Sequence, residues 1–143
     1  MNIAFAEAEA AARRGEVPVG AVVVDASGQV IARAGNRTLE LKDPTAHAEL
    51  LAIRQAAQAL GSERLTGCDL YVTLEPCAMC AGAISFARMR RLYLAASDEK
   101  MGAVEHGSRF FAQVTCHHAP DVYSGIGESD AKALLKDFFK ARR

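Results

Sequence analysis

Four residues in two short motifs could hold a metal ion and move a proton. His47 and Glu49 form a His-x-Glu motif, and Cys77 and Cys80 follow further along the chain in Pro-Cys-Ala-Met-Cys. One histidine and two cysteines make a set of three zinc ligands, whereas structural zinc sites usually have four protein ligands. Because a catalytic zinc keeps its fourth position for water, the number of ligands predicts hydrolytic chemistry. Glu49 is then the expected proton carrier.

The first motif is expected near the start of a helix. The sequence Asp43-Pro44 predicts a helix that runs to Leu60, with Asp43 as its N-cap and Pro44 in its first position. His47 would then lie in the first turn. Since His47 and Glu49 are about 200° apart around an ideal helix, they can approach one metal only if the end of the helix faces it.

The second motif is also expected where a helix begins. Pro76 predicts the start of a helix that carries Cys77 and Cys80 on one face. The partial positive charge at a helix N-terminus favours thiolate over thiol, which prepares both cysteines to bind zinc. A buried pair and a redox motif are the other interpretations of a C-x-x-C sequence, and the upstream His-x-Glu argues against both.

The zinc site would be structural if a fourth protein ligand closed it. The residues that could do so are Cys68, Cys116, His106, His117 and His118. The run Cys116-His117-His118 could also bind a second metal, but three adjacent side chains point in different directions. We take the open, catalytic site as the main hypothesis.

Helical and strand-like segments alternate around these motifs. The pattern predicts helices at residues 3–14, 43–60, 128–142 and from 76 onward, a short helix at 102–111, and strands at 20–25, 29–34, 69–74, 91–96 and 114–117. This alternation indicates a three-layer α/β arrangement, and the chain length fits a single domain over residues 1–143.

Charge and hydropathy narrow the classes of function. The chain has 17 basic and 17 acidic residues, and its net charge of zero excludes a generally basic protein that coats nucleic acid. Local basic clusters occur at residues 88–91 and in the last predicted helix, where they would hold an RNA backbone or simply form a solvated surface. Residues 1–14 lack the pattern of a secretory signal, and no apolar run reaches the roughly 20 residues of a membrane span. We therefore expect a cytoplasmic protein without a membrane segment.

Several longer stretches carry a resemblance that goes beyond the zinc motifs. Together they resemble the bacterial tRNA-specific adenosine deaminases, within the cytidine/deoxycytidylate deaminase-like zinc enzymes. The stretches are EVPVGAV at 16–22, GNR at 35–37, PTAHAE at 44–49, LYVTLEPC at 70–77, DEKMGA at 98–103 and DFFKARR at 137–143. The similarity covers nearly the whole chain.

This resemblance implies a fold, a reaction and partners. The fold would be a three-layer α/β/α cytidine-deaminase-like fold with a central, mostly five-stranded mixed sheet. The reaction would be the hydrolytic conversion of the wobble adenosine of an arginine tRNA, anticodon ACG, to inosine. The enzyme would carry one Zn²⁺ per subunit and bind the tRNA anticodon stem-loop as a homodimer.

The resemblance also implies roles for individual residues. It makes Asn36 a contact of the base and places Asp98 beside the sugar of the extruded nucleotide. Phe138 or Phe139 would pack against the anticodon loop. Asn36 is equally compatible with ordinary turn chemistry, and helical spacing places at least one phenylalanine in the core, so the choice between the two stays open.

Residues 104–126 depart from the pattern of the family. In this stretch Arg109, Phe110 and His118 would hold phosphates or stack on bases, or would serve only as core and loop residues.

Two other functions compete with the RNA enzyme. A deaminase of a free base or nucleoside, such as guanine or cytosine, would need a lidded pocket, which an open basic C-terminal helix does not favour. A non-catalytic, zinc-stapled or RNA-binding module would have no use for Glu49.

Overall fold

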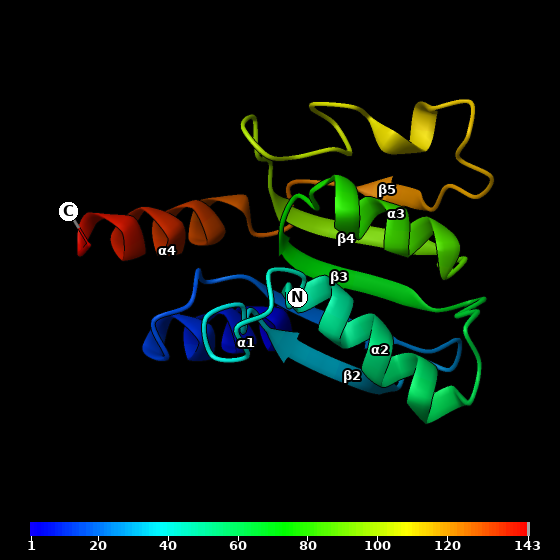
Figure 1. The fold of residues 1–143 in the computed structure, drawn as a ribbon, viewed down its shortest axis with the longest axis horizontal. Helices are drawn as coiled ribbons and strands as arrows, with labels where there is room; N and C mark the ends of the chain where they lie inside the picture. The colour runs from blue at the N-terminus through cyan, green and yellow to red at the C-terminus, as the bar shows by residue number, and fades with distance from the viewer. Residues whose placement is uncertain (143) are drawn as a thin grey trace.

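The structure, a computed structural model that describes residues 1–142, has a five-stranded sheet between two layers of helices (Figure 1). The strand order is β2-β1-β3-β4-β5, in which β1 runs antiparallel to β2 and β3, while β3, β4 and β5 are parallel. The strands are β1 (Gly20–Val24), β2 (Val30–Gly35), β3 (Asp69–Leu74), β4 (Arg91–Ala96) and β5 (Asp121–Tyr123). The helices are α1 (Asn2–Arg13), α2 (Ala48–Leu60), α3 (Ala78–Phe86), the 3-10 turn η1 (Phe110–Ala112) and α4 (Glu128–Lys140). The predicted three-layer fold with a mixed sheet is confirmed.

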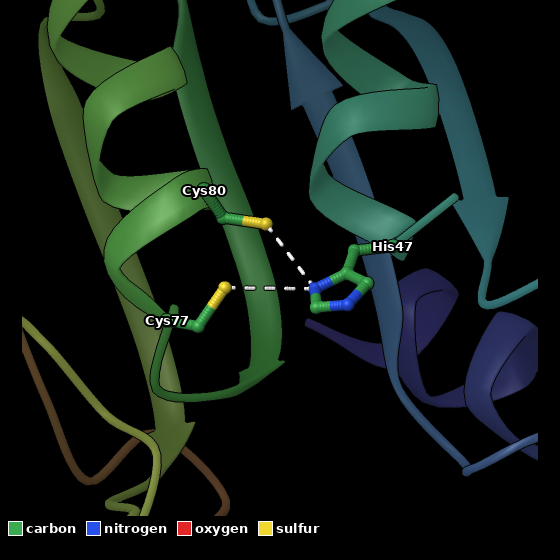
Figure 2. A group of neighbouring side chains, drawn as sticks. All are labelled: His47, Cys77 and Cys80. Carbon is green, nitrogen blue, oxygen red and sulfur yellow. Dashed lines mark hydrogen bonds between the residues drawn. The ribbon is translucent and has the colours of Figure 1, made fainter. Parts of the chain in front are cut away.

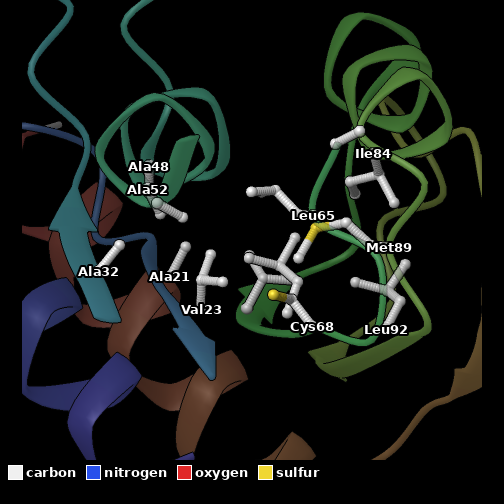
Figure 3. Packing of buried hydrophobic residues seen from close by; sticks show 14 of the residues in the cluster. Ala21, Val23, Ala32, Ala48, Ala52, Leu65, Cys68, Ile84, Met89 and Leu92 are labelled. Atoms are coloured by element: carbon white, nitrogen blue, oxygen red, sulfur yellow. The ribbon is translucent and has the colours of Figure 1, made fainter. Parts of the chain in front are cut away.

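The main core lies between the sheet and the layer formed by α2 and α3, as Figure 3 shows. Side chains alternate along a strand, so Leu70 and Val72 of β3 both point into this layer. Helix α2 presents buried alanines four residues apart, at positions 48, 52 and 56, which lets its backbone lie close to the strands. This layer brings the first turns of α2 and α3 to the same end of the sheet.

Helices α1 and α4 cover the opposite face of the sheet, and α4 extends from the body beside α1 (Figure 1). Helix α1 crosses β1 at Gly20, where an added Cβ would lie 1.9 Å from the carbonyl oxygen of Ala4. Any side chain at this position would push α1 off the sheet. The glycine in the EVPVGAV stretch therefore has a packing function.

Helix α2 begins later than the sequence predicts. The expected N-cap, Asp43, accepts hydrogen bonds from the amide and hydroxyl of Thr45, 2.8 and 2.7 Å long, and this turn precedes the helix. The helix starts at Ala48, so His47 is its N-cap residue and the prediction of a first-turn position is wrong. Helix α3 likewise starts at Ala78, after Cys77.

Two further predictions are wrong. Residues 102–111 are not a helix, because three amides of this segment donate to the carboxylate of Glu75 rather than to helical carbonyls, and only the turn η1 forms at its end. Residues 114–117 are not a strand. The Ser85 hydroxyl donates to the His118 carbonyl, 2.6 Å away, and this bond holds the chain as a loop against α3 until β5 begins. Within residues 1–142, no helix combines the length and apolar character needed to cross a membrane.

Candidate metal centre and active site

The residues just before α2 and α3 contribute to a candidate metal centre. His47 and Cys77 are the N-cap residues of these helices, and both have extended backbone conformations. Neither side chain caps its own helix, so the imidazole and the thiol are free to face each other (Figure 2). Cys80, in the first turn of α3, points at the same imidazole nitrogen. The structure thus brings the two motifs together at the N-terminal ends of these helices.

The spacing of the three side chains fits a tetrahedral zinc ion. The Nδ1 atom of His47 lies 3.6 Å from the Cys77 sulfur and 3.5 Å from the Cys80 sulfur. Zinc bonds of about 2.3 Å to sulfur and about 2.05 Å to nitrogen, at the tetrahedral angle, place a nitrogen and a sulfur about 3.6 Å apart. The ligand atoms thus already stand at the separation that zinc requires.

No fourth protein ligand joins this group in the described part of the chain. Among residues 1–142, one group of metal-binding side chains has its ligand atoms close enough to share a metal, and it consists of His47, Cys77 and Cys80. The residues that could have closed the site are engaged elsewhere or stand apart from it: Cys68, Cys116, His106, His117 and His118. The described residues thus offer three ligands at this place, which is the number that an open, catalytic site would have.

The two neighbouring cysteines shift each other's pKa in opposite directions. A hydrogen bond from the Cys80 thiol lowers the pKa of Cys77 to about 4, against the effect of burial, and His47 adds to the shift. The same pairing and burial raise the pKa of Cys80. The hydrogen bond with Cys77 also raises the pKa of His47. Binding of zinc would release the protons of these side chains, because the metal takes thiolates and a neutral imidazole.

Glu49 completes the centre. It is the second residue of α2, its side chain is buried, and its Oε2 atom lies 3.3 Å from the Cys80 sulfur. Because His47 precedes the helix and Glu49 belongs to it, both can reach one point despite their spacing. Burial raises the pKa of the Glu49 carboxyl, which suits a group that takes and returns a proton.

Known proteins with the same features are closely related to this chain. The family model described as the cytidine and deoxycytidylate deaminase zinc-binding region matches residues 1–96. A tRNA-specific adenosine deaminase of Agrobacterium fabrum (strain C58) is 64% identical over 143 residues, which is all of this chain and 93% of the relative. The chain belongs to the tRNA-specific adenosine deaminases. The predicted family is confirmed.

Solved structures give the same placement of this deaminase. One, from a study of A-to-I editing by tRNA:A34 deaminases at the wobble position of transfer RNA, is 65% identical with a TM-score of 0.93, and the match covers 94% of this chain and 97% of that one. A guanine deaminase from Bacillus subtilis is 33% identical with a TM-score of 0.67, over 99% of this chain and 90% of that one. The fold is thus shared with enzymes that act on free bases.

Asn36 lies beside the metal centre of the deaminase. Its Oδ1 atom accepts a hydrogen bond of 2.8 Å from the amide of Ala48, the first residue of α2, and its Nδ2 atom donates to the carbonyl of Val17. Asn36 thereby satisfies the helix end that the His47 side chain leaves uncapped. Its contact with a base stays a prediction.

Asp98 and Arg109 lie in one long loop that follows β4. The Oδ1 atom of Asp98 accepts hydrogen bonds from the amides of Lys100 and Met101, which makes a tight turn. Arg109 is exposed, has a positive φ of 46° and donates from Nε to the carbonyl of Glu105. Neither residue belongs to the metal cluster, and their contacts with RNA also stay predictions.

The two phenylalanines of α4 have different environments. Phe138 is 8% exposed, and the Arg142 guanidinium lies 3.5 Å from the centre of its ring. Phe139 is 47% exposed, and its ring meets that of Phe138 edge-on. The structure therefore identifies Phe139 as the aromatic side chain that is free to meet a ligand.

Sequence reasoning missed Glu75, a buried carboxylate two residues before Cys77. Burial alone would raise its pKa, but hydrogen bonds from the Asp98 amide and from His106 outweigh burial and hold the pKa below its usual value. The available signal was a glutamate placed between an apolar strand and the Pro-Cys motif. A charged residue in that position needs buried partners.

Proposed function

We propose that this deaminase converts the wobble adenosine of an arginine tRNA, anticodon ACG, to inosine by hydrolysis, with one zinc ion per subunit. The observation that carries the proposal is the buried Glu49 carboxylate beside three ligands at zinc spacing. Zinc held by His47, Cys77 and Cys80 would lower the pKa of water and so supply a nucleophile at neutral pH. Adenosine and water then give inosine and ammonia.

Glu49 would move the protons of this reaction. It takes one proton from the attacking water and gives it to the purine ring, and it then carries the remaining proton of the added hydroxyl to the departing amine. A carboxyl with a raised pKa performs both directions of transfer near neutral pH. The enclosed position of Glu49 keeps bulk water from competing for these protons.

The residues around the centre would hold an extruded nucleotide. An adenine inside the stacked anticodon cannot reach a buried glutamate, so the base must leave its stack. We assign contact with the base to Asn36, contact beside the sugar to Asp98, phosphate contact to Arg109, and stacking on the anticodon loop to Phe139. The tRNA-specific adenosine deaminases among the relatives support this choice of substrate.

The deaminase would act as a homodimer. Large apolar side chains of α2 and α3 are exposed, at Leu60, Met79 and Phe86. Phe86 is the most exposed of these, and a second copy would remove it from water. Size-exclusion chromatography with light scattering tests this: a monomer at all concentrations would contradict it.

Deamination of a free base is the second candidate, and it is supported by the fold shared with a guanine deaminase. The two are distinguished by incubating the purified protein with anticodon stem-loops that carry adenosine or cytidine at the wobble position, beside free adenosine, cytosine and guanine. The digests are analysed by mass for inosine and uridine. Inosine from the adenosine stem-loop alone is the expected result. Ammonia from a free base without an RNA product would favour the second candidate.

A further inference from the structure

Glu75 connects the metal centre to the loop that follows β4. The residue is 3% exposed, and its side chain accepts five hydrogen bonds from one loop. The donors are the amides of Asp98 (3.0 Å), Val104 (3.2 Å), Glu105 (3.0 Å) and His106 (3.1 Å) and the ring Nδ1 of His106 (2.9 Å). A neutral side chain of the same size has no second oxygen to accept so many donors.

The loop is packed tightly around this carboxylate. A Cβ added at Gly102 would lie 2.3 Å from Oε2 of Glu75 and 2.4 Å from the Asp98 carbonyl oxygen. The amide of Ala103 also donates to the carbonyl of Pro76, 2.9 Å away. Residues 98–106 are therefore bonded to the two residues that precede the zinc ligand Cys77.

The outer side of the same loop carries groups suited to RNA. Met101 is 69% exposed, Lys100 is also exposed, and Arg109 follows at the far end of the loop. In Figure 1 the loop leaves the end of β4 and lies on the side of the molecule where α3 begins. The loop thus carries exposed side chains near the metal centre, and hydrogen bonds to the buried Glu75 carboxylate hold its backbone in place.

We propose that Glu75 is a positioning residue for RNA: its carboxylate holds the loop from Asp98 to Arg109 in the conformation that binds the anticodon stem-loop before RNA arrives. This inference rests on the proposed function. It assigns Glu75 no part in the chemical step. Its carboxylate acts through the backbone of the loop.

The expected effect of losing Glu75 follows from the population of the ordered loop. When only a fraction of the protein has the competent loop, the apparent dissociation constant rises by the inverse of that fraction. A loop that is ordered one-tenth of the time would bind RNA about tenfold more weakly. Saturating RNA restores the ordered loop, so kcat and zinc content should stay near the wild-type values.

Two variants disturb the contact between Glu75 and the loop, one by changing the carboxylate and the other by changing the loop. In Glu75→Gln, the amide nitrogen must face either the Asp98 amide or the three amides at Oε2, so donors oppose donors in both orientations. In Gly102→Ala, the added methyl group displaces the loop while the carboxylate remains. If Glu75→Gln fails to fold, Gly102→Ala still tests the proposal.

Asp69→Asn is the matched control. Asp69 is a buried carboxylate at the other end of β3, about 20 Å away by strand geometry, where it accepts hydrogen bonds of 3.0 and 2.8 Å from Arg90. Its replacement weakens two hydrogen bonds of a buried carboxylate to Arg90 without touching the loop. An effect that comes from altering any buried carboxylate of β3, and not from the loop, would therefore appear in Asp69→Asn as well.

The experiment measures loop order and RNA affinity separately. Hydrogen exchange of the amides of residues 104–106 is followed without RNA, and the dissociation constant of a labelled ACG stem-loop is measured in a Glu49→Gln background, so that the RNA is not converted. We expect faster exchange and about tenfold weaker binding for Glu75→Gln and Gly102→Ala, and wild-type values for Asp69→Asn.

Faster exchange with unchanged affinity in both variants would overturn the proposal, and so would a loss of zinc or of kcat at saturating RNA. RNA binding is measured directly and does not depend on the reaction. If the wild-type protein binds the stem-loop but forms no inosine, the proposed reaction is wrong, and the effect of Glu75 on RNA affinity can still be measured.

Discussion

Replacing each phenylalanine of α4 by alanine tests which one meets RNA. Phe138 lies under the Arg142 guanidinium and is 8% exposed, whereas Phe139 is 47% exposed. Burial of a whole phenylalanine side chain stabilises a fold by about 1.5–3 kcal/mol, and a cation–π contact adds about 0.5–2 kcal/mol. We therefore expect Phe138→Ala to lower the free energy of unfolding by roughly 2–5 kcal/mol and Phe139→Ala by about 1 kcal/mol.

RNA affinity should respond in the opposite order. Stacking of a base on an aromatic side chain contributes about 1–3 kcal/mol, so Phe139→Ala should weaken binding of the ACG stem-loop roughly 5- to 150-fold. Phe138→Ala, measured at a temperature where it remains folded, should bind within a few-fold of wild type. The assays are urea unfolding and fluorescence anisotropy of a labelled stem-loop. A folded Phe138→Ala protein that loses more affinity than Phe139→Ala would refute the reasoning.

Three other perturbations test the metal centre, the core and a buried carboxylate. Cys80→Ser removes one of three zinc ligands, so the zinc content measured by atomic emission should fall well below one ion per chain, and inosine formation should stop. A variant that binds zinc and remains active would argue against this set of ligands. Ile84→Ala opens a cavity between α3 and the sheet and should lower the free energy of unfolding by about 2–5 kcal/mol, measured in urea. Burial raises the pKa of Glu16, but hydrogen bonds from the amides of Glu40 and Leu39 outweigh burial, and the pKa of Glu16 is lowered overall. The ionised form of Glu16 therefore stabilises the fold at pH values above the unfolded pKa. This stabilisation is lost as the pH falls through the folded pKa. Glu16→Gln should therefore lower the free energy of unfolding by about 1–3 kcal/mol near pH 7 and by progressively less below about pH 4.5. A loss of stability that does not depend on pH would contradict the stabilising role of ionised Glu16.

The metal centre and the sheet were predictable because their signals are local. Residue type and spacing single out His47, Cys77 and Cys80 as candidate ligands, and the structure brings them together. Strand-like segments bounded by turn signals predict strands β1 to β4 within a residue or two. Helices α2 and α3 start later than Pro44 and Pro76 predict, at Ala48 and Ala78. At Asp43 a local side-chain turn is formed instead of the helix.

The loop after β4 was not predictable from its own sequence. Its amides find their acceptor in Glu75, which is more than twenty residues earlier in the chain, and no local pattern reports such a bond. Periodicity also could not separate Phe138 from Phe139. Both are apolar neighbours on an amphipathic helix, and only their packing against Arg142 and the body of the protein distinguishes them.

Proton transfer by Glu49 during zinc-dependent hydrolysis is tested most directly by the rate of inosine formation from the ACG stem-loop with wild-type protein and with Glu49→Gln. Zinc content and RNA affinity are measured on the same samples. The variant should bind zinc and RNA as the wild type does and form inosine about 10²- to 10⁴-fold more slowly, because the attacking water and the leaving amine lose their proton carrier. A zinc-loaded variant that forms inosine at the wild-type rate would contradict the role of Glu49.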